Sequence, residues 1–406
     1  MQTNPKVLLV FLTLLDDSTA MLKGIAHYER ARDPWNAFLD DLARAENDPE
    51  WLRNKNWSGV ISRHTSRALV QNCKKMGIPL VDLNDGPPFP GVPKIRPDNL
   101  AIGHLGAEHF IDRGFRHFAF SGFGSDLWSC ERRDGFREAL QLAGYDCHVL
   151  DVKWPGEMSP QWDDEQVTKL ATWLKSLPKP VGIMGCHDLR ALQVLSAAHA
   201  AGLKVPEDVA VLGANNDAVR CDLPYPQLSS VDTNAFLSGY CAAETLDRLM
   251  HGDDVAQADV RIQPVGVVTR HSTEVLAIPD KNVVNALRLI RERACAGLTV
   301  SELVRQVAAS RSQLERKFRH YLGRSLQAEI RNVQLARIKE LLFETDFPLK
   351  KIAEITGFEH PEYMCVLFKR LTGESPGSYR NRLPGKAEKS TSRTLRIAAD
   401  DWSGGQ

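Results

Sequence analysis

The stretch IAEITGFEHPEYMCVLFKRLTGESPGSYR, residues 352–380, contains two short helical patterns on either side of a glycine. Gly357 permits a tight turn, and Pro361 stands near the start of the second helix, where its missing N–H is not needed. The first helix is predicted to bury Leu349, Ile352, Ala353 and Ile355. A helix, a tight turn and a second helix form the arrangement that places the second helix in the major groove of DNA.

The second helix of this stretch has an apolar and a polar face. Its predicted inward side chains are Met364, Leu367 and Phe368. Its predicted outward side chains are Glu362, Tyr363, Cys365, Val366, Lys369 and Arg370. All of the outward residues except Val366 are candidate DNA contacts, because side chains on such a helix reach base edges or phosphates.

An earlier stretch, VSELVRQVAASRSQLERKFRHYLGRSLQAEI at residues 300–330, repeats this plan. Thr299 with Glu302 and Ser310 with Gln313 have the spacing of capping boxes at two helix starts. The second of these helices is predicted to bury Leu314, Phe318 and Leu322. Its outward candidate DNA contacts are Arg311, Ser312, Gln313, Glu315 and Arg316. One connecting helix over residues 326–342 is expected to fix the separation of the two units.

Charge divides the chain of 406 residues at nearly the same place. Residues 280–386 hold 20 Lys and Arg against 12 Asp and Glu, a net charge of +8. Residues 1–279 hold 28 basic against 36 acidic residues, a net charge of −8. A basic segment joined to an acidic body indicates that one end meets a polyanion while the other has a different task. Charge alone leaves an uneven solvated surface as the alternative.

The fixed spacing of the second unit resembles the double helix-turn-helix domain of the AraC family of transcription regulators. The matching pattern is aliphatic-Ala-x-x-x-Gly-Phe, then Phe-Lys-x-x-x-Gly, then Pro-x-x-Tyr-Arg, and the resemblance covers roughly residues 285–382. It implies a DNA-binding domain over 285–384 with units at 299–322 and 349–371. Val366 stands where the family often has Arg, so the second unit is expected to favour phosphate contact or shape readout.

The first 275 residues alternate short apolar runs, rich in β-branched residues, with stretches of helical period. The predicted strands are 7–12, 59–62, 79–83, 117–122, 148–152, 181–186 and 209–214. The predicted helices include 101–112, 132–143 and 189–201. Gly144 and Gly202 follow the last two in C-cap positions. This alternation predicts a doubly wound α/β architecture with parallel sheets, in which ligands bind at the carboxyl ends of the strands.

Four segments of this region carry a second resemblance. They are RPDNLAIGHLGAEHFIDRGFRHFAFSG (96–122), RRDGFREAL (132–140), VAVLGANND (209–217) and PQLSSVD (226–232). In this order they are similar to the sugar-sensing core of LacI-type repressors, which is related to periplasmic binding proteins. The resemblance implies a ligand-sensing domain over residues 1–275, with two α/β lobes and a ligand cleft between them. Residues 276–284 are then a linker, and 385–406 are expected to be a disordered tail.

The LacI-type resemblance also implies a set of ligand-binding residues. Sugar recognition needs polar groups for the hydroxyls and an aromatic face for the ring. Arg132 is implied to meet sugar hydroxyls, and Trp128 to stack on the ring. The full implied set is Arg132, Asp188, Asn215, Trp128, Asp16 and Ser18, the last two from the other lobe. Each has a local alternative: a surface charge for Arg132, an N-cap for Asp188, a turn for Asn215, and a core position for Trp128.

Other chemistries lack their motifs in this sequence. The eight cysteines show no CxxC and no metal-ligand spacing, so they predict isolated thiols in a reducing compartment and no metal site. Neither a phosphate-binding glycine loop nor paired catalytic carboxylates appear, and we expect no cofactor and no enzyme activity. No signal peptide or transmembrane run is recognisable, because Asp16 and Asp17 directly follow the first apolar run. The sequence predicts a cytoplasmic location.

Together these patterns predict a transcription regulator, expected to be an activator of sugar catabolism genes. The resemblances imply double-stranded DNA as one partner, a pentose such as D-xylose as effector, RNA polymerase as a further partner, and a homodimer. Two alternatives stay open: the same architecture sensing a ligand other than a sugar, which Asn215 in place of the usual Asp keeps open, and a sugar-binding module or enzyme that does not act on DNA.

Overall fold

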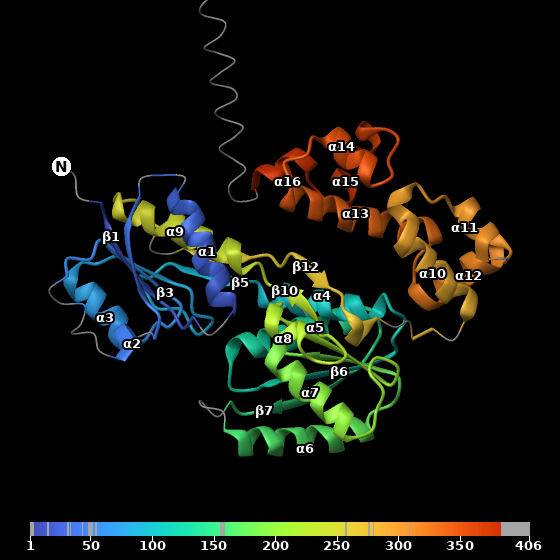
Figure 1. Cartoon of the computed structure of the whole chain (residues 1–406), viewed down its shortest axis with the longest axis horizontal. Helices are drawn as coiled ribbons and strands as arrows, with labels where there is room; N and C mark the ends of the chain where they lie inside the picture. Colours follow the sequence, from blue (N-terminus) through green and yellow to red (C-terminus); the bar gives the residue numbers. More distant parts are fainter. Residues whose placement is uncertain are drawn as a thin grey trace, which may run out of the picture. The chain divides into compact units, whose positions relative to one another are not determined.

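The computed structural model of the chain divides into two units, Met1–Ala277 and Ile278–Gln406 (Figure 1). The structure describes residues 4–13, 16–30, 32, 34–42, 44–47, 52, 55–154, 159–255, 258–274, 277–278, 280–307 and 309–382. The predicted tail over 385–406 lies outside these residues.

The first unit has two lobes, each built on one sheet. Lobe 1 has the strand order β11-β5-β4-β3-β1-β2, and its strands pair in parallel. Its strands are β1 (Lys6–Val10), β2 (Asn36–Asp40), β3 (Gly59–Ser62), β4 (Leu80–Asp82), β5 (Lys94–Pro97) and β11 (Asp259–Ile262). Its helices are α1 (Asp16–Arg30), α2 (Arg44–Asn47), α3 (Arg67–Met76) and α9 (Ala235–Met250).

Alternate side chains of the central strand β1 feed two separate cores. Val7 and Leu9 pack with α1 and α9, which lie side by side on one face of the sheet (Figure 1). Leu8 and Val10 pack with α3 on the other face. A strand buried on both faces reads as a continuous apolar run, which is why VLLVFL was predictable as a central parallel strand.

Lobe 2 repeats the plan with the strand order β12-β10-β9-β8-β6-β7. Its strands are β6 (His117–Phe123), β7 (Cys147–Val152), β8 (Val181–Gly185), β9 (Val209–Ala214), β10 (Ser229–Asp232) and β12 (Gly266–Val268), of which β12 is antiparallel. Its helices are α4 (Asn99–Ile111), α5 (Leu127–Leu142), α6 (Pro160–Ser176), α7 (Asp188–Ala200), α8 (Ala218–Asp222) and the 3-10 turn η2 (His271–Thr273). Helices α4 and α5 cover one face of this sheet, and α6 and α7 cover the other.

The chain crosses between the lobes after β5, after β10 and after β11. Polar contacts tie these crossings together. Arg96 on β5 donates from Nη1 to both carboxylate oxygens of Glu131 on α5, at 3.1 Å each. Gln263 donates from Nε2 to Asp98 Oδ2 at 2.8 Å. Crossings grouped in this way form a compact hinge between the lobes.

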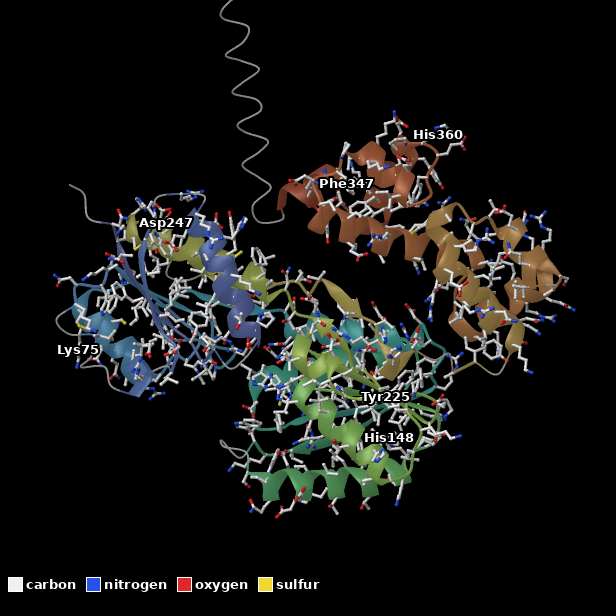
Figure 2. The ribbon with its side chains drawn as sticks, viewed as in Figure 1. Lys75, His148, Tyr225, Asp247, Phe347 and His360 are labelled. Carbon is white, nitrogen blue, oxygen red and sulfur yellow. The ribbon has the colours of Figure 1, made fainter. Side chains whose placement is uncertain are left out.

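The second unit is all helical in its described part. Its helices are α10 (Lys281–Arg293), α11 (Val300–Val307), α12 (Arg311–Leu322), α13 (Leu326–Glu344), α14 (Leu349–Ile355), α15 (Pro361–Thr372) and α16 (Pro376–Arg382), with the 3-10 turn η3 (Ala294–Ala296). Figure 2 marks Phe347 in the connection before α14 and His360 in front of α15. Two parallel-sheet lobes followed by a helical unit confirm the predicted fold class.

Some local predictions needed correction. The helix predicted over 132–143 begins earlier, at Leu127, so Arg132 lies inside α5 rather than at its first residue. Strand β2 was missed because most of its side chains are exposed at the sheet edge, and it has no buried apolar run. Helix α10 begins at Lys281, inside the stretch 276–284 that was expected to be a linker.

Candidate ligand-binding and DNA-binding sites

Arg132 lies at the centre of the candidate ligand site in lobe 2. It is 2% exposed, and its Nε and Nη1 donate to partners within the lobe. Its Nε donates to Asn99 Oδ1 at 2.9 Å, and its Nη1 donates to the carbonyl of Cys186 at 2.7 Å and to Asn215 Oδ1 at 3.2 Å. These acceptors lie on α4 and just after β8 and β9, so Arg132 connects the carboxyl ends of neighbouring strands.

Close packing of α4 on α5 brings Arg132 to this position. A Cβ atom on Gly103 would lie 2.1 Å from the carbonyl oxygen of Arg132, and one on Gly135 would lie 2.2 Å from the carbonyl oxygen of Leu100. Contacts this short exclude any side chain at either glycine, because the neighbours are backbone atoms. The two helix backbones therefore approach closely, and the guanidinium reaches the strand ends.

Asn215 lies in a turn that directly follows β9. Asn215 and Asn216 have φ angles of 107° and 53°, which residues other than glycine rarely adopt. The turn is held by its backbone: the N–H of Asn215 donates to Val231 O at 3.0 Å, and that of Asn216 donates to Ser230 Oγ at 2.9 Å. Strained backbone of this kind concentrates at functional sites.

Asp188, the first residue of α7, supports this turn from inside the lobe. Its Oδ2 accepts from the N–H of Asp217 at 2.9 Å, and its Oδ1 accepts from Ser230 Oγ at 2.5 Å. Burial raises the pKa of Asp188 to about 7, although both hydrogen bonds favour the carboxylate. Because protein groups occupy both oxygens, the structure places Asp188 beneath the ligand residues as a support for the turn.

Trp128 packs on Arg132, whose guanidinium carbon lies 5.1 Å from the centre of the indole ring. The ring of His187 lies 5.4 Å from that of Trp128 at an interplanar angle of 37°. Burial and Arg132 lower the pKa of His187 to about 3, so this imidazole is neutral at physiological pH. The aromatic pair therefore fixes the plane of the guanidinium without adding charge.

Lobe 1 presents a second polar cluster, also at the carboxyl ends of its strands. Arg63, just after β3, donates from Nη2 to Asp17 Oδ2 and to Asp85 Oδ2, each at 3.2 Å. Burial alone would lower the pKa of Arg63, but the two carboxylates raise it above its ordinary value. The start of α1 and the segments after β3 and β4 thus meet at one guanidinium.

A buried ion pair holds the loop that carries Asp85. Lys94 Nζ lies 2.9 Å from Asp82 Oδ2, and both side chains are at most 2% exposed. Lys94 also donates to the carbonyl of Asn84, and the N–H of Asn84 donates to Asp82 Oδ1 at 2.9 Å. The chain after β4 is therefore fixed where Asp85 meets Arg63.

Several buried polar atoms of this lobe 1 cluster have no hydrogen-bond partner within the described residues. They are Ser18 Oγ, Ser62 Oγ, Arg63 Nε, His64 Nε2 and Asp85 Oδ1. Native proteins keep few such atoms, because each costs about 1–3 kcal/mol. Grouped at one sheet edge, these donors and acceptors match what a molecule rich in hydroxyl groups can satisfy. Asp16 begins α1 beside them, and its side chain is outside the described part of the chain.

The two clusters face one another. Burial lowers the pKa of Arg132, and the negative charges of Asp85 and Asp17 in lobe 1 are among those that oppose this lowering. His64 is neutral, since burial and Arg63 lower its pKa to about 4. Arg132, which contacts Asn215 and Trp128, therefore lies within electrostatic reach of Asp17 in lobe 1, the neighbour of Ser18.

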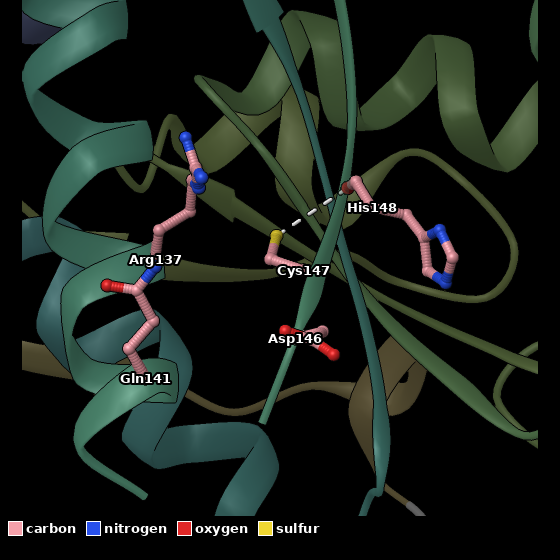
Figure 3. A pocket seen from close by; sticks show the side chains of 5 residues that line it. All are labelled: Arg137, Gln141, Asp146, Cys147 and His148. Atoms are coloured by element: carbon pink, nitrogen blue, oxygen red, sulfur yellow. Dashed lines mark hydrogen bonds between the residues drawn. The ribbon is translucent and has the colours of Figure 1, made fainter. Parts of the chain in front are cut away.

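A pocket of about 300 Å³ lies at a different end of lobe 2 (Figure 3). Arg137 and Gln141 of α5 line it together with Asp146, Cys147 and His148 at the start of β7. Burial raises the pKa of the Cys147 thiol to about 12, so the thiol stays protonated. The candidate ligand residues lie at carboxyl ends of strands, whereas this pocket lies at an amino end, and it is separate from them.

The described chain offers no group of three or more His, Cys, Asp or Glu side chains able to hold a metal ion. Within the same residues, no helix is long and apolar enough to cross a membrane. All eight cysteines are free thiols.

In the second unit, α11 and α12 form the first helix-turn-helix. The predicted capping box is present: Glu302 Oε2 accepts from the N–H of Thr299 at 3.0 Å, and Thr299 Oγ1 accepts from the N–H of Glu302 at 3.2 Å. Ser310 caps α12 through the N–H of Gln313 at 3.3 Å. Leu314, Phe318 and Leu322 are buried as predicted. The predicted DNA contacts Arg311, Ser312, Gln313 and Arg316 are exposed, whereas Glu315 is only partly exposed.

The second helix-turn-helix consists of α14 and α15. Gly357 makes the turn with a φ of 76°, and α15 begins at Pro361. Met364, Leu367 and Phe368 are buried as predicted. Glu362, Tyr363, Lys369 and Arg370 are exposed. Cys365 was expected to face outward, but it packs against the core of this half, because it follows Met364 on the edge of the apolar face.

Gln334 on α13 links the turn η3, which precedes α11, to the end of α14. It is 2% exposed, and its Nε2 donates to Ala294 O at 3.1 Å and to Thr356 O at 2.9 Å. Its Oε1 accepts from Arg331 Nη1 at 2.8 Å, and Arg331 lies over the ring of Tyr363 at 5.2 Å. One buried amide therefore bonds to a carbonyl of η3 and to one at the end of α14, which holds both segments against α13.

The sequence prediction missed the lobe 1 residues Asp17, Arg63, His64 and Asp85. The rule that ligands bind at carboxyl ends of parallel strands could have found them, because Arg63 and His64 directly follow the predicted strand 59–62. In lobe 2 it also missed Asn99, which is a partner of Arg132. No local pattern marks Asn99, since its role depends on the packing of α4 against α5.

Two family descriptions match the chain. Residues 107–273 match a periplasmic binding protein-like domain, and residues 303–382 match a helix-turn-helix domain. The first match lies mainly in lobe 2, and the second covers both helix-turn-helix units.

The chain is similar over most of its length to curated transcription regulators. It is 30% identical over 368 residues to the xylose operon regulatory protein of Haemophilus influenzae, covering 89% of this chain and 94% of that protein. It is 29% identical over 373 residues to the xylose operon regulatory protein of Escherichia coli K12, covering 89% of this chain and 93% of that protein. The solved structure of the xylose-binding transcription activator xylR matches with a TM-score of 0.58 and 26% identity, covering 94% of this chain and 99% of that one.

Proposed function

The chain belongs to the AraC-type helix-turn-helix transcription regulators with a periplasmic-binding-protein-like sensor domain, the type of the xylose operon regulatory proteins, and from this premise we propose that it activates pentose catabolism genes in response to D-xylose. Regulators of this type bind DNA and are not enzymes, so the enzyme alternative is dropped. The proposal extends to a cytoplasmic homodimer that contacts RNA polymerase.

One observation carries the choice of a sugar as effector. The buried guanidinium of Arg132 in lobe 2 faces a lobe 1 cluster in which Ser18, Ser62 and His64 hold buried polar atoms without protein partners among the described residues. Hydroxyl groups of a sugar both donate and accept, so one molecule can satisfy an arginine, two serines and a neutral imidazole together. An anionic ligand fits less well, because Asp17 and Asp85 stand beside this cluster.

The proposed mechanism follows from the two facing edges. A sugar that contacts both lobes favours the state in which they are closed, because it makes its full set of contacts only there. Closure changes DNA occupancy only if the two states differ in how the DNA-binding units of a dimer are presented. Helices α12 and α15 of each chain then read two successive major-groove segments about 10 bp apart.

Calorimetric titration of the full chain tests the effector. We expect D-xylose to bind with a dissociation constant below about 1 mM and other pentoses and hexoses to bind more weakly. The variant Arg63→Met should lose most of this affinity, because Arg63 organises the lobe 1 cluster. A matched control is Arg44→Met, an arginine of the same lobe whose side chain is 63% exposed and paired with Asp40. If neither D-xylose nor any other pentose or hexose binds, the proposed effector class is ruled out.

A gel-shift assay at a stated salt concentration tests the DNA contacts. Arg311→Ala and Arg316→Ala should each weaken binding by about 1–3 kcal/mol if they reach bases, or reduce the salt slope by about 1 if they reach phosphates. The control is Arg288→Ala, which removes an arginine of α10 that is 68% exposed. If all three variants bind DNA with the affinity of the wild type, Arg311 and Arg316 of α12 do not contact DNA as proposed.

A further inference from the structure

The segment that leaves lobe 2 toward α10 is tightly attached to that lobe. We call residues 269–274 and 277 the exit segment. Arg113 donates from Nε to Thr273 O and from Nη2 to Thr269 Oγ1, each at 3.0 Å. The N–H of Ala277 donates to Arg113 O at 2.9 Å. Thr269, Thr273 and Ala277 are therefore all held by Arg113 of lobe 2.

Buried serines attach the same segment to the central strands. Ser229 on β10 accepts through Oγ from the N–H of Arg270 at 2.8 Å and donates to Arg270 O at 2.9 Å. Ser272 donates from Oγ to Val211 O on β9 at 2.6 Å. Both serines are fully buried. A shift of β9 or of the start of β10 therefore reaches the exit segment directly.

The side chain of Arg270 connects the exit segment to the asparagine turn of the candidate ligand site. Its Nη1 donates to Asn216 Oδ1 and to Leu228 O, each at 3.1 Å, and its Nε donates to Asp222 Oδ1 at 2.9 Å. The side chain is 15% exposed. The planar guanidinium thus holds three acceptors from three separate segments, an arrangement that a lysine cannot reproduce.

These contacts complete an unbroken path. Arg132 donates to Asn215, Asn216 follows in the same turn, and Arg270 donates to Asn216. Resting on the proposed function, we infer that Arg270 is a positioning residue: it transmits sugar occupancy at Arg132 and Asn215 to the exit segment, and so to the DNA-binding unit that follows. Arg270 itself touches neither the sugar nor DNA in this role.

Two features allow this path to pass a movement of the Asn215–Asn216 turn to the exit segment. The Asn215–Asn216 turn has a strained backbone, so a change in its contacts can move it between arrangements. Arg270 is tied at its side chain to that turn and at its backbone to Ser229. Movement of the turn must therefore shift Arg270 or break its hydrogen bonds, and either result alters the exit segment.

The test breaks the path at two points in the full-length chain. Arg270→Met removes the guanidinium and keeps the bulk of the side chain. Asn216→Gly removes the acceptor and tolerates the φ of 53° at that position. The matched control is Arg248→Met in lobe 1, which removes an arginine paired with Asp253 at 2.9 Å. Arg270→Lys serves as the conservative variant, which keeps the charge and part of the hydrogen bonding.

The first measurement is the ratio of DNA affinities with and without saturating D-xylose, on a fragment selected in vitro by the wild-type chain. In Arg270→Met and Asn216→Gly we expect this ratio to fall toward one, and in Arg270→Met the binding of D-xylose without DNA should change little. Arg270→Lys should recover part of the ratio, and Arg248→Met should keep all of it. Retention of the wild-type ratio in both path variants would overturn the inference and leave the proposed function intact.

The second measurement needs no sugar. Hydrogen exchange should become faster at the amides of Ser272, Glu274 and Ala277 in Asn216→Gly, although that substitution lies outside the exit segment. Lobe 1 amides should exchange as in the wild type. Unchanged exchange at these three amides would refute the inference. If D-xylose does not bind the wild-type chain, the proposed effector fails, and the exchange result alone decides the role of Arg270.

Discussion

The carboxyl edges of the two lobes have similar positions in their sheets but opposite hydrogen-bond states. In lobe 2, Arg132, Asn215 and Asp188 are bound to one another or to backbone groups. In lobe 1, Ser18 and Ser62 are fully buried and have no partner among the described residues. Most polar groups at the lobe 2 edge are bonded within the protein, whereas the lobe 1 edge holds a group of buried donors and acceptors without partners among the described residues.

This difference predicts that substitutions in the two lobes affect stability and ligand affinity differently. Substitutions in the lobe 2 network remove bonds that hold the native lobe together, so they should cost stability as well as ligand affinity. Substitutions at the unpartnered atoms of lobe 1 remove bonds that protein groups do not make, so they should cost affinity alone. The predictions below test this contrast, beginning with the largest expected effect.

Arg132→Ala should have the largest effect. It leaves Asn99 Oδ1, Cys186 O and Asn215 Oδ1 without their donor, at a cost of about 4 kcal/mol in the free energy of unfolding. Binding of D-xylose should be abolished. The neighbouring Arg133→Ala is the control, because Arg133 is 22% exposed and pairs with Asp151, and it should cost about 1 kcal/mol or less. Urea denaturation and calorimetry measure the two effects, and equal losses in both variants would contradict the assigned role of Arg132.

Asp188 gives stability a pH dependence. Because burial raises the pKa of Asp188 from 3.8 to about 7, the native state binds its proton more tightly than the unfolded chain does. Its contribution to the free energy of unfolding is therefore full below pH about 4 and is lost as pH rises through about 7. At no more than about 1.4 kcal/mol per pH unit, and with the slope halved near pH 7 where the native carboxyl is half ionised, the loss between pH 5 and 7 is about 2 kcal/mol.

Asp188→Asn should remove this dependence. His64 and His187 act in the opposite direction, since burial lowers their pKa values to about 4 and about 3. The quantity to compare is therefore the free energy of unfolding of Asp188→Asn minus that of the wild type. Urea denaturation measures it at each pH from 5 to 8. Asp253→Asn, at an exposed position, is the control. A difference that stays constant with pH would mean that Asp188 does not titrate in this range.

Ser121→Ala is expected to have a moderate effect confined to stability. Ser121 lies on β6, is fully buried, accepts from Arg190 Nε at 2.9 Å and donates to Leu150 O at 3.3 Å. Its loss leaves a buried guanidinium nitrogen without a partner, at a cost of about 2 kcal/mol. Ser121→Cys, which keeps a weak acceptor, should cost less. Thermal or urea denaturation measures the free energy of unfolding of both variants. An unchanged value in Ser121→Ala would contradict the assigned role of Ser121.

The sequence predicted the parts of the molecule whose signals are local. Central strands such as β1 and β9 are continuous apolar runs, and both helix-turn-helix units carry capping residues and turn glycines at fixed spacing. Five of the described strands were missed: β2, β5, β10, β11 and β12. Strand β2 is an edge strand with mostly exposed side chains, and β5 (KIRP) and β10 (SSVD) are buried but contain polar residues instead of an apolar run. The bonds of Arg132 join residues 54 and 83 positions apart. Only the resemblance to LacI-type cores pointed to Arg132. Arg63 and Asp85 follow predicted strands at 59–62 and 79–83, so the strand-end rule could have nominated them, but no sequence signal pairs them with Arg132.

Ser62→Ala should have the smallest effect on stability and is the counterpart of Ser121→Ala. Both serines are fully buried on strands, but Ser62 Oγ has no hydrogen-bond partner within the described chain. Removing an unpaired hydroxyl takes away a desolvated polar group, so the free energy of unfolding should change by less than about 0.5 kcal/mol, or rise. Affinity for D-xylose should fall about fivefold to tenfold, the value of about one hydrogen bond. The opposite pattern is lost stability with unchanged affinity. It would mean that Ser62 Oγ is hydrogen-bonded within the protein and that the sugar is recognised elsewhere.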